Sequence, residues 1–342
     1  MRLGIEIGGT KLQLGAGAGG GAAPLEIVRR DVCIADGARG ILDQIAAVAK
    51  PLIAKHSMRA IGIGFGGPYD ASTRRVVKSH QVGGWDNFPL ADWCEAELGL
   101  PTRIGNDCDC AALAEALDGA GRGSGSVFYV TVGTGIGGGL VVGGRLHGAG
   151  RPAVAEIGHL RPGLECRDAE QTVESLASGP ALAHRARQRI KEILAPIRTD
   201  RRGDGGDSGD SGGDSGNADE SAERRAAAEI LAAFPQGATA RELGPFVAAG
   251  NVVAWEVIDE ALRALGWAIA QVITIVAPQV IVVGGGVALL GDRLFHQPLR
   301  RHVDAYVFPP LRGSYQILPP ALGESVVVQG ALRLWDAADS SK

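Results

Sequence analysis

The sequence predicts an α/β protein with two domains. A chain of 342 residues is too long for one ordinary hydrophobic core. Apolar, β-branched runs typical of buried strands alternate with stretches of helical periodicity. Three of the predicted strands end in glycine-rich turns, at residues 8–10, 133–139 and 284–286. Since α/β proteins hold ligands where strands end at one edge of a sheet, these turns are candidates for a binding site.

The composition is that of a globular protein with a slight negative charge. Apolar residues make up 45% of the chain, charged residues 21%, and the net charge of −4 argues against a nucleic-acid surface. The five cysteines include no CxxC pair, as expected of reduced thiols in the cytoplasm. A first strand starting at Leu3 leaves no room for a signal peptide, and Pro278 makes residues 268–290 a helix and a strand instead of a membrane span. We therefore expect a cytoplasmic protein without membrane partners.

The first glycine turn carries polar groups between two predicted strands. Residues 3–7 and 12–14 alternate as strands do, and the sequence Gly-Gly-Thr at 8–10 lies between them, followed by Lys11. Glycine N–H groups, a hydroxyl and an ammonium suit a phosphate, and Glu6 could face a metal ion or water held by it. The alternative is a surface lysine beside an edge carboxylate. The turn is not a Walker A loop, because GxxxxGK[ST] is absent.

The second and third glycine turns also follow buried strands. Residues 127–132 lead into a predicted turn at 133–139 with five glycines in seven residues, and a strand resumes at 140–142. Such a turn can form an anion nest, to which Thr134 adds a hydroxyl; the alternative is a glycine-rich turn without a ligand. The third turn, at 284–286, opens on a helix predicted for 288–295, whose N-terminus favours a phosphate or a flat base.

Asn106 and Asp107 lie between a predicted strand and the helix predicted for residues 111–117. Asn or Asp opening a helix is what capping predicts. The functional interpretation makes Asp107 a general base and Asn106 a substrate ligand. A weak carboxylate base suffices for phosphoryl transfer, whose catalysis is mostly positioning and charge neutralisation. The residues alone leave both interpretations open.

Further polar candidates lie downstream. Glu156 and His159 can present hydrogen-bonding groups to a polyhydroxylated ligand or serve a metal, although a lone histidine is more often structural. Glu174 precedes a helix predicted for 180–194 and suits the N-terminal end of a helix. Trp85, in a polar loop, is either a substrate platform or a core aromatic residue.

One segment has the composition of an insertion. Residues 203–217 contain only Gly, Asp, Ser and Asn, so they cannot bury apolar surface to offset the entropy of ordering. We therefore predict a disordered Gly/Asp/Ser insertion over 200–220. A calcium-binding repeat is disfavoured, because no apolar position exists on which turns could stack.

The motifs GGTK, NDxD, GTGIGGG, ExGH and VVGGGV, in this order, resemble the ROK family of bacterial sugar kinases. The resemblance implies an actin-like, ribonuclease-H-like pair of α/β domains, with ATP, Mg²⁺ and a sugar in the interdomain cleft. It implies a first domain of residues 1–106, joined by a C-terminal helix at about 324–342, and a second domain of 107–323. It also implies a glucokinase-like, cytoplasmic homodimer that phosphorylates glucose or a related hexose.

The resemblance also implies roles for single residues. Asp107 would deprotonate a sugar hydroxyl, which then attacks the γ-phosphate of ATP. Glu6 would contact the magnesium ion. The sugar would be bound by Gly67, Asn106, Asp107, Glu156, His159 and Glu174. The phosphates would be held by Gly8, Gly9, Thr10, Lys11, Gly133, Thr134 and Gly135, and the adenosine flanked by Gly285 and Gly286.

The chain departs from the family pattern at two places. Members usually have Asp where this chain has Glu6, which extends the carboxylate by one methylene. Many relatives also carry a cysteine-rich zinc module where residues 164–174 contain Cys166 alone, so we predict no structural zinc. These departures motivate an alternative, a catalytically weakened sugar- or nucleotide-binding regulator. The family's repressors carry a DNA-binding segment ahead of the first turn, for which we expect no space here.

Overall fold

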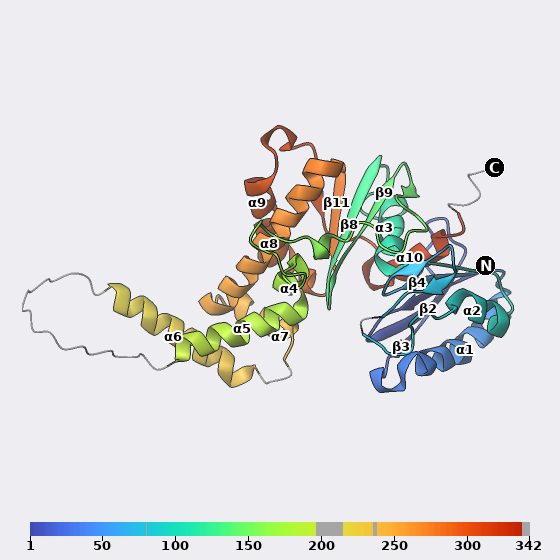
Figure 1. Ribbon diagram of the computed structural model, residues 1–342, viewed down its shortest axis with the longest axis horizontal. Coiled ribbons are helices and arrows are strands. Elements are labelled where there is room, and N and C mark those ends of the chain that lie inside the picture. Colours follow the sequence, from blue (N-terminus) through green and yellow to red (C-terminus); the bar gives the residue numbers. More distant parts are fainter. Residues whose placement is uncertain (80, 196–214, 235–237, 337–342) are drawn as a thin grey trace, which may run out of the picture.

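The structure is a computed structural model that describes residues 1–79, 81–195, 215–234 and 238–336. Within these residues each half of the chain forms a five-stranded sheet (Figure 1). The first sheet has the order β3-β2-β1-β4-β7, with strands β1 Arg2–Ile7, β2 Lys11–Gly17, β3 Glu26–Asp31, β4 Ile61–Phe65 and β7 Thr102–Asn106. The second has the order β10-β9-β8-β11-β12, with strands β8 Ser126–Val132, β9 Ile136–Val142, β10 Arg145–Leu146, β11 Val280–Gly284 and β12 Gln316–Leu318.

The two sheets repeat one pattern of pairing. In the first, β1 pairs antiparallel with β2 and β2 with β3, whereas β1, β4 and β7 run parallel. In the second, β8 pairs antiparallel with β9 and β9 with β10, whereas β8, β11 and β12 run parallel. Each half is therefore a three-stranded meander followed by two parallel strands. Short strands β5 Tyr69–Asp70 and β6 Arg75–Val76 form a separate ribbon.

The side chains of β1 alternate between the two faces of the first sheet. Leu3, Ile5 and Ile7 belong to a core shared with helix α1 Gly37–His56. Gly4 and Glu6 point to the opposite face, where a Cβ on Gly4 would lie 2.6 Å from the backbone oxygen of Val328. That face is covered by helix α10 Val326–Arg333, while helix α2 Leu90–Leu98 contacts α1 and β7. Glu6 thus faces the middle of the molecule.

Helix α3 Asp107–Leu117 and α10 lie between the two sheets (Figure 1). They contact each other closely because glycines remove side chains at the crossing. A Cβ on Gly330 would overlap the backbone of Cys110, and one on Gly62 in β4 would overlap the backbone of Ala331. Both neighbours are backbone atoms that cannot move aside, so glycine is required at these two positions.

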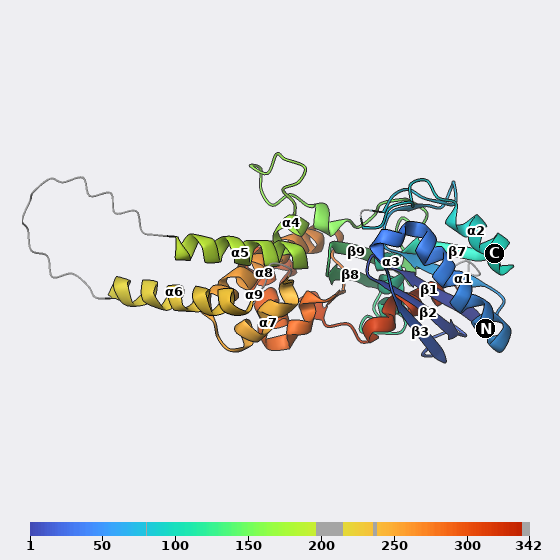
Figure 2. The same cartoon turned by 90° about the horizontal axis from the view of Figure 1, so that it is seen from below.

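The second half surrounds its sheet with helices. Helix α8 Val252–Val276 is one continuous element in a core with β8 and β11. Figure 2 shows α5 and α6 running side by side, away from the sheet. The other helices here are α4 Val173–Ala177, α5 Gly179–Leu194, α6 Ser215–Ala233, α7 Ala240–Ala248 and α9 Gln297–Tyr306. None of the helices in the described part of the chain is long and apolar enough to cross a membrane.

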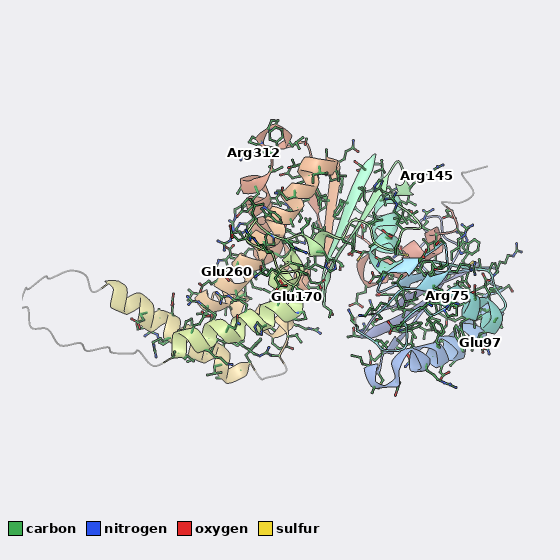
Figure 3. All side chains as sticks on the ribbon, viewed as in Figure 1. Arg75, Glu97, Arg145, Glu170, Glu260 and Arg312 are labelled. Atoms are coloured by element: carbon green, nitrogen blue, oxygen red, sulfur yellow. The ribbon has the colours of Figure 1, made fainter. Side chains whose placement is uncertain are left out.

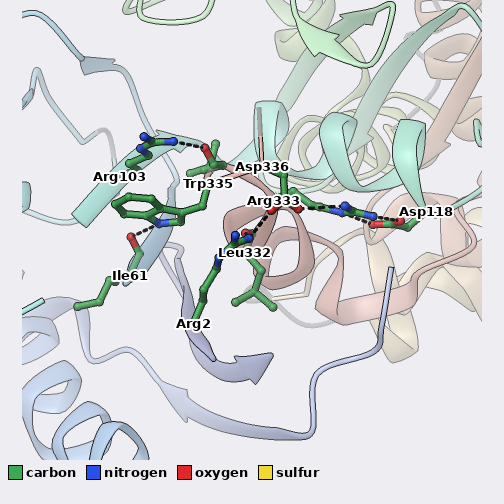
Figure 4. A network of polar contacts seen from close by, with 9 residues as sticks. Arg2, Ile61, Arg103, Asp118, Leu332, Arg333, Trp335 and Asp336 are labelled. Atoms are coloured by element: carbon green, nitrogen blue, oxygen red, sulfur yellow. Dashed lines mark hydrogen bonds and ion pairs between the residues drawn. The ribbon is translucent and has the colours of Figure 1, made fainter. Parts of the chain in front are cut away.

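The C-terminal end of the described chain is tied to the first sheet by a polar network (Figure 4). Arg2 contacts Asp336 at 2.5 Å, and Arg333 binds both Asp336, at 3.0 Å, and Asp118, the residue that caps α3. The indole of Trp335 donates to the backbone oxygen of Ile61 at 2.9 Å and is covered by the guanidinium of Arg103. The network fixes α10 against β1, β4 and α3.

Two sequence expectations are corrected. The predicted turn at 133–139 is shorter, because β9 already begins at Ile136 and takes in the last three glycines. These glycines make room for α3: a Cβ on Gly139 would lie 2.7 Å from the backbone oxygen of Cys108, and one on Gly137 would overlap the Cys108 sulfur. The helix predicted for 288–295 is instead a 3-10 turn, Val287–Leu290, and a π-helical turn, Asp292–His296, separated by Gly291 with φ of 86°.

The predicted insertion at 200–220 lies only partly within the described residues. Residues 200–214 are outside them. Residues 215–220 are helical instead of disordered, since α6 begins at Ser215. Alanine, glutamate and arginine dominate the stretch that follows the Gly/Asp/Ser run, and these are strong helix formers.

Candidate active site

The first glycine turn, Gly8–Thr10, connects β1 to β2 and is held by backbone bonds. The N–H of Gly8 donates to the oxygen of Lys11 at 2.9 Å, and the N–H of Gly66 donates to the oxygen of Ile7 at 2.8 Å. A Cβ on Gly9 would overlap the side chain of Gln81, which therefore lies directly over the turn. Gln81 was not predicted as a site residue. Its only sequence signal is its place in the polar loop around Trp85.

Glu6 and Lys11 form an ion pair beside this turn. The Lys11 Nζ lies 3.0 Å from Glu6 Oε1. Glu6 is buried, and its Oε2 has no hydrogen-bond partner within the described residues. Burial raises the pKa of Glu6, while the nearby Lys11 ammonium opposes that rise and the Asp107 carboxylate adds to it. The carboxylate thus has one paired oxygen and one available for a further ligand.

Asn106 ends β7 and caps α3. Its Oδ1 accepts the N–H groups of Cys108 at 2.8 Å and Asp109 at 3.4 Å. Its Nδ2 donates to the backbone oxygen of Gly67 at 3.3 Å. Asn106 can therefore cap α3 and also contribute to a binding site. Its Oδ1 is fixed by the cap, while its NH₂ group reaches the bend after β4.

Asp107 is the first residue of α3 and lies next to the first turn. Its Oδ1 accepts the N–H of Cys108 at 2.8 Å. A Cβ on Gly66 would be 3.4 Å from Asp107 Oδ2 and 3.6 Å from the Cα of Gly8. Burial raises the pKa of Asp107, and the Cys108 N–H and the Lys11 ammonium oppose the rise. The carboxylate therefore holds a proton more readily than an ordinary aspartate does.

Asp109 is a second carboxylate in the first turn of α3, and sequence reasoning gave it no role. Burial, with the charges of Asp107 and Glu156, raises its pKa to about 7. Its spacing of two residues from Asp107 at a helix start was the available signal. The site therefore contains a carboxyl group that titrates near neutral pH.

The second turn is bonded to the α4–α5 region. The N–H of Ile136, directly after Gly135, donates to Glu174 Oε2 at 2.7 Å. The N–H of Gly179 donates to the oxygen of Gly133 at 2.8 Å. Glu174 lies in the first turn of α4, a short helix before α5 that was not predicted from the sequence, and a carboxylate suits that position.

Glu156 precedes a 3-10 turn, Ile157–His159, of which His159 is the last residue, and both side chains are exposed. A Cβ on Gly158 would overlap the backbone oxygen of Ile136, so this segment packs directly on β9. Partial desolvation raises the pKa of Glu156; the His159 ring lowers it, and the carboxylates of Asp107 and Glu174 raise it further. Glu156 thus lies within electrostatic range of Asp107.

Gly285 follows β11 and lies against the end of β8. Its φ is 94°, and a Cβ there would be 2.5 Å from the backbone N and O of Val132. Glycine is therefore required at Gly285, whereas a Cβ on Gly286 would meet nothing within 4 Å. These two glycines border the second turn and not the Glu6 and Asp107 region.

Four further residues singled out in the sequence are placed as follows. Thr10 and Thr134 are exposed at the tips of the two turns. Trp85 is buried between Phe65 and Phe88 in edge-to-face contacts, so it is a core residue. The Cys166 thiol donates to the backbone oxygen of Pro162 at 3.1 Å.

Known proteins resemble this chain over almost its full length. A family model described as the ROK family matches residues 2–338. A glucokinase from Halalkalibacterium halodurans is 30% identical over 96% of this chain and 92% of its own length. A glucokinase from Thermotoga maritima is 28% identical over 96% of this chain and 95% of its own length.

Solved structures agree with this fold. A ROK family glucokinase from Streptomyces griseus, in complex with glucose and AMPPNP, is 28% identical with a TM-score of 0.75, covering 97% of this chain and 98% of that protein. A ROK hexokinase from Thermus thermophilus is 27% identical with a TM-score of 0.70, covering 99% of both chains. The predicted actin-like α/β fold is thereby confirmed.

Proposed function

The chain belongs to the ROK family, and we propose that it is an ATP-dependent sugar kinase that phosphorylates a hydroxyl of glucose or a related hexose. The glucokinases that resemble it over nearly its whole length support this activity. The observation that carries the proposal is the position of Asp107, at the start of α3, beside the first glycine turn and within range of Lys11 and Glu156.

Asp107 is the proposed general base. Its carboxylate takes the proton of the sugar hydroxyl as the hydroxyl oxygen forms a bond to the γ-phosphorus of ATP. The bond from that phosphorus to the bridging oxygen breaks, and ADP leaves with the electron pair. A raised pKa makes Asp107 a better proton acceptor than an ordinary aspartate.

The remaining candidates divide between the reactants. The sugar is bound by Gly67, Asn106, Glu156, His159 and Glu174, with Asn106 held by its bond to Gly67. The phosphates lie against Gly8, Gly9, Thr10 and Lys11 on one side and Gly133, Thr134 and Gly135 on the other, and the adenosine lies against Gly285 and Gly286. Glycine at 285 lets the backbone approach β8 closely.

Glu6 fits a magnesium ion through its free oxygen. Its buried Oε2 has no hydrogen-bond partner among the described residues, and oxygen ligands are those Mg²⁺ prefers. Bound there, the ion would neutralise phosphate charge during transfer. The protein would act as a cytoplasmic homodimer without structural zinc.

A coupled assay of ADP release over a panel of sugars tests the function. Glucose or a related hexose should stimulate turnover, and Asp107→Ala should lower the rate by roughly 10²–10⁴ through loss of the proton acceptor. Asp43→Asn, on the exposed side of α1, is the control and should keep full activity.

The alternative function is a sugar- or nucleotide-binding regulator with weakened catalysis. The Glu6–Lys11 ion pair favours it, because Lys11 already neutralises the carboxylate. If sugar raised the thermal stability of the protein but no sugar stimulated ADP release from ATP, the regulator would be supported and the kinase refuted.

A further inference from the structure

We propose that Glu174 is a positioning residue for the nucleotide: its carboxylate holds the second turn, Gly133–Gly135, in the conformation that receives phosphate. This inference rests on the proposed kinase function and gives Glu174 a role beyond the sugar contact. It makes one carboxylate serve both reactants.

The first support is a direct bond to the turn. Glu174 Oε2 accepts the N–H of Ile136 at 2.7 Å, across 38 positions of sequence. The same oxygen would lie only 2.6 Å from a Cβ on Gly135, so the carboxylate rests against the turn itself. A hydrogen bond from a backbone N–H to a charged acceptor is among the stronger kinds in proteins.

The second support is that the other end of the turn is bonded to the same helical region. The N–H of Gly179, the first residue of α5, donates to the oxygen of Gly133 at 2.8 Å. The N–H of Ser178 donates to the backbone oxygen of Glu174 at 3.0 Å. The turn is therefore held at Gly133 and at Ile136 by residues only five positions apart.

The third support is the placement of α4 itself. Thr172 and Ser175 form a reciprocal capping box that fixes the start of α4. The N–H of Val173 donates to the oxygen of Leu160 at 2.9 Å, directly after the segment of Glu156 and His159. Helix α4 thus connects the proposed sugar-binding segment to the proposed phosphate turn.

The test separates the two roles by measuring nucleotide affinity without sugar. Titration calorimetry with AMPPNP and Mg²⁺ should show Glu174→Ala weakening affinity about 10-fold, because the Ile136 N–H loses its acceptor. Glu174→Gln should stay within about 3-fold of wild type, since its amide oxygen accepts the same N–H. Glu170→Ala removes an exposed glutamate just before α4 (labelled in Figure 3) and should bind as wild type does.

Kinetics give a second readout. Glu174→Ala should raise the KM values for both sugar and nucleotide, whereas Glu174→Gln should raise the sugar KM alone. Unchanged AMPPNP affinity in Glu174→Ala would overturn the positioning role and leave the kinase function standing. Equal loss in the Ala and Gln variants would overturn the hydrogen-bond account. A wild-type protein that binds neither AMPPNP nor sugar would refute the proposed function itself, and this inference with it.

If Glu174→Ala does not fold, the AMPPNP affinities of Glu174→Gln and Glu174→Asp are compared instead. The shorter side chain withdraws the oxygen by one methylene while keeping the charge. Aspartate should therefore lose AMPPNP affinity where glutamine keeps it. The reverse order would show that charge, and not the bond to Ile136, is what matters, and would overturn the proposal.

Discussion

The two glycine turns at the centre of the molecule occupy equivalent places in the two sheets but are stabilised differently. Gly8–Thr10 connects the first two strands of one meander, and Gly133–Gly135 the first two of the other. The first turn is flanked by the Glu6–Lys11 ion pair at 3.0 Å. The second is held by backbone groups bonded to Glu174 and Gly179.

This difference indicates a division of labour between the turns. A buried carboxylate with a lysine partner and one unpaired oxygen supplies charge, at a point bordering Asp107. A turn fixed at both ends supplies preorganised N–H groups, whose value depends on geometry. Damage to the first turn should therefore lower the rate of catalysis, and damage to the second should weaken nucleotide binding.

At the two turns, the largest expected effect comes from Lys11→Ala. The substitution removes a phosphate-binding cation and leaves the buried Glu6 without its partner. Loss of one such group should lower kcat by about 10². The measurement is steady-state kinetics with saturating sugar and nucleotide.

Lys55→Ala is the matched control for that variant. Lys55 pairs with Glu26 at 2.8 Å on the exposed surface, so the variant breaks a lysine–glutamate pair of similar length away from the site. Its kcat should equal that of wild type. A Lys11→Ala enzyme with the same kcat would show that the charge at the first turn has no catalytic role.

The next prediction compares the loss of stability on replacing each of two glycines in the second turn. A Cβ on Gly135 would lie 2.6 Å from Glu174 Oε2, whereas one on Gly133 would meet nothing within 4 Å. The Glu174 carboxylate can move aside only by leaving the buried Ile136 N–H. Gly135→Ala should therefore destabilise the ligand-free protein by about 1–3 kcal/mol, as an unsatisfied buried donor does, and Gly133→Ala by less than about 0.5 kcal/mol. Chemical denaturation without ligand measures both, and equal values would contradict this account of the turn.

Local sequence patterns predicted most of the fold. Alternation predicted β1, apolar runs predicted β8 and β11, and the actin-like architecture was implied by the resemblance that the order of the motifs carries. The structural role of two glycines was predicted wrongly. Gly137 and Gly139 looked like turn residues, but they lie in β9 because α3 packs against them. That requirement comes from a helix distant in sequence, so a local pattern cannot contain it.

Candidate site residues could be proposed from the sequence, but the bonds between them could not. Asp107, Glu156 and Glu174 are recognisable from motif order, yet nothing local indicates that Glu174 would bond to the N–H of Ile136, 38 positions away. Asp109 was missed for a similar reason. Its pKa is raised mainly by burial, with contributions from Asp107 and Glu156, and only the folded chain creates that environment.

The smallest expected effect concerns Asp109, which lies in α3 between the two turns. Its pKa is 3.8 when exposed and about 7 when folded, so between these pH values the folded state binds the additional proton. The free energy of unfolding therefore falls as pH rises across this window and levels off above it. Asp109→Asn cannot titrate and should lack that loss, and its stability relative to wild type should increase by roughly 1 kcal/mol between pH 6 and 7.

Urea denaturation of both proteins from pH 4 to 9 measures that difference, with Asp43→Asn as the control for loss of one exposed charge. Burial is the largest cause of the Asp109 shift, followed by the carboxylates of Asp107 and Glu156. Glu156→Gln should therefore reduce the pH dependence without abolishing it. If wild type and Asp109→Asn gave parallel stability curves, the pKa of Asp109 would be the same in the folded and unfolded states, and its carboxylate would be ionised at neutral pH. The charge between the two turns would then be fixed, and catalysis near neutral pH would depend on Asp107 and Glu6 alone.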